Sequence, residues 1–177
     1  MESIQELYRI GHGPSSSHTM GPRIAAEQFR ARSTGAVSYR VSLYGSLAAT
    51  GRGHLTDKAI REALEPLEVE FLWKLDEELP QHPNGMIFEA LDAAGNCTDR
   101  WQGYSIGGGA IQAEGEYAGK NQVYKESSMQ EIMRLCTQSG KTFWEYVEDC
   151  EGKEIWNYLS RILKVMHASI ERGLNTE

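Results

Sequence analysis

The hydrophobic pattern of the first third of the chain alternates between helical and strand-like spacing. After Pro22, which suits the first turn of a helix, apolar residues recur at helical spacing up to Gly35. Strict alternation over residues 37–43 then predicts a strand with one buried face. Residues 45–55 read as a turn region, and Thr56 is a plausible N-cap for the helix that follows it.

The middle of the chain is richer in turn residues and β-formers. Residues 66–79 fit either a short strand or a helical turn, and the pattern does not decide between them. A turn at 82–85 precedes a hairpin of 86–91 and 97–106, and 110–117 gives one more strand. The expected fold class is α+β, with an α-β-α-β-β-β core around a mixed or antiparallel sheet.

The last third of the chain predicts helices with clear boundaries. Capping boxes begin at Ser128 and Thr142, each with a Glu three residues later, and Gly140 and Gly152 end the segments between them. One further helix carries a single apolar stripe, made of Ile155, Leu159, Ile162, Leu163, Met166 and Ile170. This division predicts an α+β domain over residues 1–126 and a helical extension over residues 127–177.

Composition and charge narrow the function classes. The net charge is −7 and the chain has no basic run, which argues against nucleic acid or an anionic membrane as partner. No apolar stretch approaches the roughly 20 residues that span a bilayer. The polar, periodic N-terminus is unlike a signal peptide, so we expect a cytoplasmic protein.

The cysteines and histidines do not predict a metal site. Cys97, Cys136 and Cys150 are widely spaced and form no CxxC, so we expect free thiols in a reducing cytosol. No two histidines have close ligand spacing. If an iron–sulfur cluster matters to this protein, another polypeptide segment must carry most of its ligands.

A serine-rich loop directly before the first helix is the first candidate for chemistry. It contains Ser15, Ser16, Ser17, His18 and Thr19. Backbone N–H groups at a helix N-terminus favour an anion, and the hydroxyls add donors, so the loop suits a carboxylate or a phosphate. The alternative is an N-cap followed by a solvated loop.

The second candidate is the glycine-rich loop over residues 44–57. Glycines flank Arg52, and His54 lies just ahead of a helix, where the neutral imidazole is favoured and can act as a base. The loop lacks the Gly-Lys-Ser/Thr ending of a Walker A motif. A surface-loop histidine is the alternative interpretation.

Two shorter segments complete the set. In HPNG the turn explains the Asn-Gly pair but does not explain His82. The triple glycine at 107–109 follows a strand and presents backbone N–H groups to a ligand or a partner chain, unless it is a simple bulge or bend.

Four segments of this chain together resemble one protein family. GPSSSHTMGP, YGSLAATGRGHLTD, LPQHPNGM and YSIGGG occur in this order in bacterial iron–sulfur-dependent L-serine dehydratases, in the β chain or the N-terminal part of single-chain members. WNYLSRILKVMHASIERGL also resembles the segment that joins the two parts in single-chain members. This favours a separated N-terminal domain over a natural subunit.

The resemblance implies an activity that this chain shares with a partner. The expected enzyme is an L-serine ammonia-lyase that converts L-serine to pyruvate and ammonia. Its [4Fe–4S] cluster lies on the α, cluster-binding part and is not ligated by this chain. The full enzyme is expected to be a homo-oligomer, with no nucleic-acid or membrane partner.

The resemblance also implies site residues and a fold. His54 and His82 are the candidate bases, and Ser15, Ser16, Ser17, His18 and Thr19 line the site and receive the substrate carboxylate. The α+β core is expected to be similar to the allosteric substrate-binding domain of some D-3-phosphoglycerate dehydrogenases. That similarity carries the alternative function, a regulatory domain that binds serine without turning it over.

Overall fold

The computed structural model describes residues 1–116 and 122–176, and the chain forms two compact units. One unit is Gly11–Ala118 and the other combines Met1–Ile10 with Gly119–Glu177. The first ten residues therefore belong with the C-terminal helices. The predicted domains, 1–126 and 127–177, stay a prediction.

The first unit is an α+β fold, which confirms the expected class. In its described part, five strands form one mixed sheet in the order β2-β1-β3-β4-β5, with β1 and β2 parallel and the other neighbours antiparallel. The strands are β1 (Ser38–Tyr44), β2 (Glu68–Lys74), β3 (Gly85–Leu91), β4 (Cys97–Gly107) and β5 (Ala110–Ala113). The helical segments are η1 (Ser16–Met20), α2 (Gly21–Arg32), α3 (Gly45–Thr50) and α4 (Thr56–Leu64).

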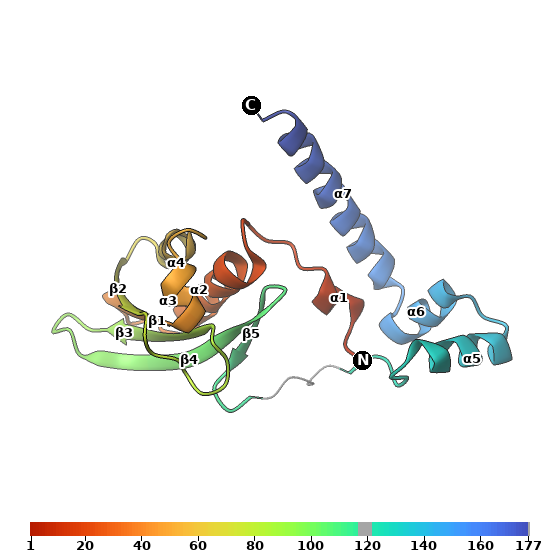
Figure 1. The fold of residues 1–177 in the computed structure, drawn as a ribbon, viewed down its shortest axis with the longest axis horizontal. Helices are drawn as coiled ribbons and strands as arrows, with labels where there is room; N and C mark the ends of the chain where they lie inside the picture. The colour runs from red at the N-terminus through yellow and green to blue at the C-terminus, as the bar shows by residue number, and fades with distance from the viewer. Residues whose placement is uncertain (117–121, 177) are drawn as a thin grey trace. The chain divides into compact units, whose positions relative to one another are not determined.

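Three helices, α2, α3 and α4, lie on one side of the sheet (Figure 1). The alternating pattern of β1 directs its apolar side chains to that side, where they form the core with those of β3 and the helices. Phe88 is fully buried at the centre, with Phe29 of α2 at 5.6 Å and Trp101 of β4 at 5.8 Å between ring centroids. The core thus joins both layers.

Several expected elements are confirmed, and two are wrong. The helix after Pro22, the strand before residue 44 and the hairpin of β3 and β4 are all present. The segment left undecided forms β2, so the sheet has one more strand than expected. The expected strand 110–117 ends at Ala113, and Tyr117 lies outside the described residues.

The first wrong expectation concerns residues 45–55, which contain the helix α3 rather than only turns. The second concerns Thr56, which is the first residue of α4 and not its N-cap. Leu55 precedes α4 in the left-handed conformation, with φ of 58°. The Thr56 hydroxyl instead donates to the carbonyl oxygen of His18, a distant segment, which local sequence does not reveal.

The sheet topology brings the ends of four segments to one edge. The parallel strands β1 and β2 end there together, since Tyr44 pairs with Lys74. The antiparallel β3 begins at the same edge, and Gly85 pairs with Tyr104 near the end of β4. The loops that follow β1, β2 and β4 therefore all leave the sheet at this edge.

The second unit consists of helices. They are α1 (Ile4–Leu7), α5 (Met129–Ser139), α6 (Phe143–Glu151) and α7 (Glu154–Leu174). Both predicted capping boxes are confirmed, because each cap accepts from its Glu backbone N–H and each Glu side chain bonds back. No helix in the described ranges is long and apolar enough to cross a membrane.

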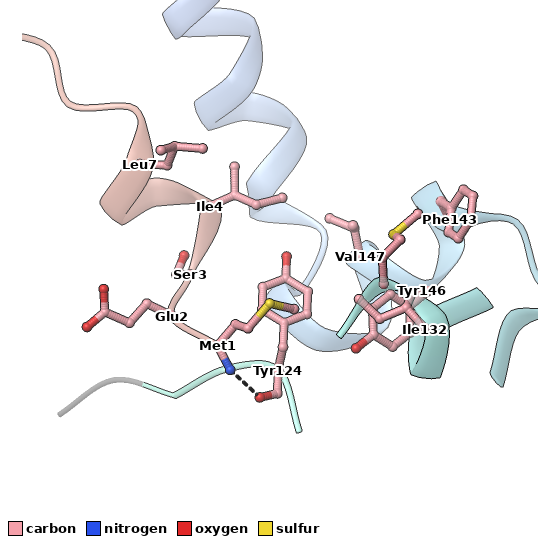
Figure 2. Close-up of a pocket in the computed structure, with 11 residues that line it drawn as sticks. Met1, Glu2, Ser3, Ile4, Leu7, Tyr124, Ile132, Phe143, Tyr146 and Val147 are labelled. Atoms are coloured by element: carbon pink, nitrogen blue, oxygen red, sulfur yellow. Dashed lines mark hydrogen bonds between the residues drawn. The ribbon is translucent and has the colours of Figure 1, made fainter. Parts of the chain in front are cut away.

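A largely apolar pocket of about 320 Å³ lies within this second unit. Figure 2 shows Met1 and Ile4 at the pocket beside Tyr124, and the N-terminal amino group donates to the Tyr124 carbonyl oxygen at 2.8 Å. Ile132 of α5 and Val147 of α6 also line it. These contacts explain why the first residues belong with the C-terminal helices.

Replacement of Phe88 by Ala tests the core. It removes a fully buried ring in contact with two aromatic neighbours, and we expect it to lower the free energy of unfolding by about 3–5 kcal/mol. Urea denaturation followed by circular dichroism measures the change. Leu75→Ala is the control, because Leu75 is 59% exposed and its loss is expected to change little. A near-neutral Phe88→Ala would contradict this assignment of the core.

Candidate active site

His18 and His54 come together in space, and two threonines hold them there. The imidazole centroids are 4.9 Å apart. The Thr19 hydroxyl donates to the His54 carbonyl oxygen at 2.7 Å, and the Thr56 hydroxyl donates to the His18 carbonyl oxygen at 2.5 Å. Each loop thus receives a hydrogen bond from a threonine beside the other histidine. We call these two reciprocal hydrogen bonds the threonine clasp.

His18 uses both ring nitrogens within the protein. Its Nδ1 lies 2.9 Å from the Ser17 hydroxyl, and its Nε2 lies 3.0 Å from the Ser46 hydroxyl on α3. Burial lowers the pKa of His18, repulsion from His54 lowers it further, and the backbone of Ser46 opposes both effects. The ring is therefore neutral near pH 7 and is held by hydroxyl groups on both sides.

His54 has one ring nitrogen engaged by a backbone carbonyl. Its Nδ1 lies 3.0 Å from the carbonyl oxygen of Thr50, the last residue of α3. A carbonyl oxygen only accepts, so Nδ1 carries the proton in this contact. In the neutral ring the lone pair then lies on Nε2, which is the nitrogen able to take a proton.

His82 has the opposite arrangement. Its Nδ1 accepts a hydrogen bond from the backbone N–H of Asn84 at 3.1 Å. In the neutral ring the proton is therefore on Nε2, which makes that nitrogen a donor. The loop that carries His82 contacts α3 through Pro83, whose carbonyl oxygen accepts from the N–H of Ser46. The side chain of Ser46 in turn contacts His18.

The remaining residues of the serine loop differ in their exposure and in their hydrogen bonds. Ser15 caps η1, since its hydroxyl accepts from the His18 N–H at 3.1 Å. Ser16 is exposed, Ser17 is half-buried and Thr19 is only 3% exposed. Ser16 is therefore accessible to a ligand, the Ser17 hydroxyl contacts the His18 ring, and Thr19 ties the two loops together. The substrate-binding role of this set stays a prediction.

The YSIGGG segment packs closely against the end of the serine loop and the start of α2. A Cβ atom on Gly21 would lie 2.3 Å from the Ser105 hydroxyl, and one on Gly109 would lie 2.2 Å from Cε of Met20. Ser105 is fully buried, and its hydroxyl has no partner among the described residues. Its carbonyl oxygen accepts from the Asn84 side chain at 3.2 Å, so this segment also holds the His82 loop.

Sequence reasoning named the histidines but missed three residues that position them. Ser46, Asn84 and Ser105 lie inside the singled-out segments, yet only the Asn was noticed, and then as a turn residue. The glycine before Ser46 was a usable signal in the sequence, because the structure gives Gly45 a positive φ of 48° and leaves no room for a Cβ beside the Pro83 carbonyl oxygen. Asn84 orients His82 through a local backbone contact, while the bond that joins Asn84 to Ser105 links segments distant in sequence.

The residues of this chain do not fit an iron–sulfur cluster. Cys97 is on β4, whereas Cys136 and Cys150 are on α5 and α6 of the other unit. No three metal-ligating side chains gather anywhere in residues 1–116 and 122–176. Such a cluster normally needs several cysteine thiolates.

The contact between Gly21 and Ser105 is testable by a double-mutant cycle. We expect Gly21→Ala to destabilise the protein by about 1–3 kcal/mol, because its Cβ overlaps the Ser105 hydroxyl. In a Ser105→Gly background the same change is expected to be neutral or stabilising, since Ala favours a helix. Urea denaturation of the four proteins gives the coupling, and equal effects in both backgrounds would refute the contact.

The lowered pKa of His18 predicts a pH dependence of stability. The unfolded chain binds this proton more readily than the folded one, so stability falls as the pH drops below about 6.5 and levels off below the folded pKa. We expect His18→Gln to reduce the slope of the unfolding free energy against pH in that window. Urea titrations at several pH values measure it, and an unchanged slope would count against the assignment.

Comparisons with known proteins agree on one family. The family model described as serine dehydratase beta chain matches residues 3–70 and 63–116. An L-serine dehydratase of Haemophilus influenzae is 32% identical over 228 aligned residues, which cover 100% of this chain and 50% of that protein. L-serine dehydratase TdcG of Escherichia coli is 31% identical, with the same coverage. The chain spans about half the length of the curated relatives it matches, and it belongs to the serine dehydratase beta chain family.

Proposed function

We propose that this chain is the β part of an L-serine dehydratase and supplies substrate-binding and acid/base groups for the deamination of L-serine to pyruvate and ammonia. The observation that carries the proposal is the His18–His54 pair. The pair is built from family motifs, and Nε2 of His54 has no hydrogen-bond partner in the described part of the chain, so this nitrogen can accept a proton. The relatives named above are L-serine dehydratases, which supports the same substrate.

His54 is the proposed base that removes the proton from Cα of L-serine. Its Nδ1–H is engaged by the Thr50 carbonyl oxygen, so the ring is oriented and its Nε2 lone pair faces away from that contact. Loss of the β-hydroxyl group gives an aminoacrylate, which tautomerises and hydrolyses to the two products. A neutral His18 beside His54 adds no positive charge to oppose proton uptake.

His82 is the proposed donor. With Nδ1 occupied by the Asn84 N–H, a neutral His82 presents Nε2–H, which suits a hydrogen bond to the hydroxyl or carboxylate oxygen of the substrate. His82 can serve as the base only if Asn84 releases that nitrogen. The hydrogen-bond directions therefore favour His54 over His82 for proton removal.

The carboxylate of L-serine is proposed to bind beside Ser16 and Ser17 at the start of η1, where an exposed and a half-buried serine accompany a helix N-terminus. The [4Fe–4S] cluster is assigned to the α part, since the residues that the structure describes do not gather ligands for it. We further infer that the chain is inactive without the α part, and that the full enzyme is a cytoplasmic homo-oligomer.

Reconstitution with a cluster-bearing α part tests the function. We expect no serine turnover by this chain alone and pyruvate formation by the pair, measured with a coupled dehydrogenase assay. His54→Gln is expected to lower kcat by about 10²–10⁴-fold, because proton abstraction contributes on that scale. His82→Gln is expected to have a smaller effect.

The matched control is His167→Gln, which changes an exposed histidine on α7 of the other unit. Its turnover should equal that of the unchanged pair. Serine turnover by the reconstituted enzyme with both His54→Ala and His82→Ala would contradict the roles of these two histidines as base and donor. Calorimetry that shows serine binding by the isolated chain, unaffected by Ser16→Ala/His54→Ala, together with an inactive pair, would support a regulatory domain instead.

A further inference from the structure

The guanidinium group of Arg52 lies over an aromatic side chain of the sheet. Its guanidinium carbon is 5.0 Å from the ring centroid of Trp73 on β2, and Trp73 in turn stacks on Phe71 at 6.1 Å between centroids. Such a stack attracts the cation and restricts its orientation, yet it uses none of the guanidinium N–H groups. The five donors at the edge of the fork are left for another partner.

Arg52 differs in this from the other arginines of its unit. Seven arginines lie between residues 11 and 116. Six of them donate to an oxygen atom of the protein: Arg23, Arg30, Arg32, Arg40, Arg61 and Arg100. Within the ranges that the structure describes, the Arg52 guanidinium contacts the Trp73 ring and has no hydrogen bond or ion pair, while the Arg52 backbone carbonyl accepts from the N–H of Leu55. A cation that is oriented but not neutralised is suited to an external anion.

The position of Arg52 ties it to the candidate active site. Trp73 is the penultimate residue of β2 and pairs with Leu43 near the end of β1, at the sheet edge where the loops gather. Arg52 lies in the turn that joins α3 to His54, two residues after Thr50, whose carbonyl oxygen contacts the His54 ring at the end of α3. One short turn thus carries both a base and an unpaired cation.

We propose that Arg52 binds the carboxylate of the amino-acid substrate, an inference that rests on the proposed function. The proton that a base removes is on Cα, and Cα also carries the carboxylate, so the cation that holds this group must lie close to the base. The planar fork of Arg pairs with a carboxylate through two parallel hydrogen bonds. Ser16 and Ser17 offer only neutral donors. In a chain of net charge −7, Arg52 supplies a positive charge for the carboxylate group of the zwitterionic substrate.

Steady-state kinetics of the reconstituted enzyme test this role. We expect Arg52→Gln to raise KM for L-serine by about 10- to 100-fold, the range of a lost charge-assisted hydrogen-bond pair, with kcat changed by less than about 3-fold. Arg52→Lys keeps the positive charge but lacks the planar guanidinium group. Its KM is expected to lie between that of the unchanged enzyme and that of Arg52→Gln. Such a split between KM and kcat distinguishes substrate binding from a role in stability.

Arg61→Gln is the matched control. Arg61 also lies over an aromatic residue of β2, with its guanidinium carbon 5.2 Å from the Phe71 centroid, but it donates to the Val69 carbonyl oxygen. Its KM should equal that of the unchanged enzyme. A KM for Arg52→Gln within 2-fold of that value, in an enzyme that does turn over serine, overturns the inference and leaves the proposed function standing.

A binding measurement separates the two ideas further. We expect L-serine to shift the Nε–Hε signal of Arg52 in ¹H–¹⁵N spectra of this chain, and L-serinamide, which lacks the carboxylate, to leave it in place. If the reconstituted pair is inactive, the proposed function fails, and the shift alone decides whether Arg52 binds the carboxylate. Equal responses to the two compounds, or no response, would refute the inference.

Discussion

The threonine clasp fixes the spacing of the candidate site. Thr19 and Thr56 are almost fully buried, and each donates its hydroxyl proton to the carbonyl oxygen of a histidine in the other loop. One such bond stabilises a fold by about 1 kcal/mol, but a buried hydroxyl or carbonyl left unpaired is more costly than that. Neither loop can therefore move alone without exposing or orphaning a polar group. The 4.9 Å separation of the His18 and His54 rings is a consequence of this pairing.

The threonine clasp can form because the serine loop before α2 and the His54 loop after β1 lie at the same edge of the sheet. The parallel β1 and β2 end together, and α2 runs away from this edge, since Gly21 at its start meets Ser105 and Arg32 at its end pairs with Asp99. The first turn of α2 thus lies above the strand ends. Ligands of open α/β sheets bind beyond the carboxyl ends of parallel strands for the same geometric reason.

Sequence reasoning succeeded where the cause is local. The capping boxes at Ser128 and Thr142 depend on residues three positions apart, and the alternation of β1 depends on neighbours, so both could be predicted. Thr56 was misassigned because its hydroxyl has a partner 38 residues away, which no local pattern records. The four site segments were identified from their residue types and order, but their contacts were not. The partners of Ser46 and Ser105 follow only from the sheet topology.

The chemistry of the two loop histidines is set by the backbone rather than by their side-chain type. His54 meets a carbonyl oxygen at Nδ1, and His82 meets an amide N–H at the same atom, so the neutral rings carry their protons on opposite nitrogens. An identical pair of imidazoles becomes one acceptor and one donor at Nε2. Acid/base roles are commonly divided by pKa, through burial or a nearby charge. In the proposed function, the direction of one backbone hydrogen bond would divide the roles, because it selects the tautomer of each neutral ring. The partner backbone groups of Thr50 and Asn84 are placed by the end of α3 and by the turn before β3.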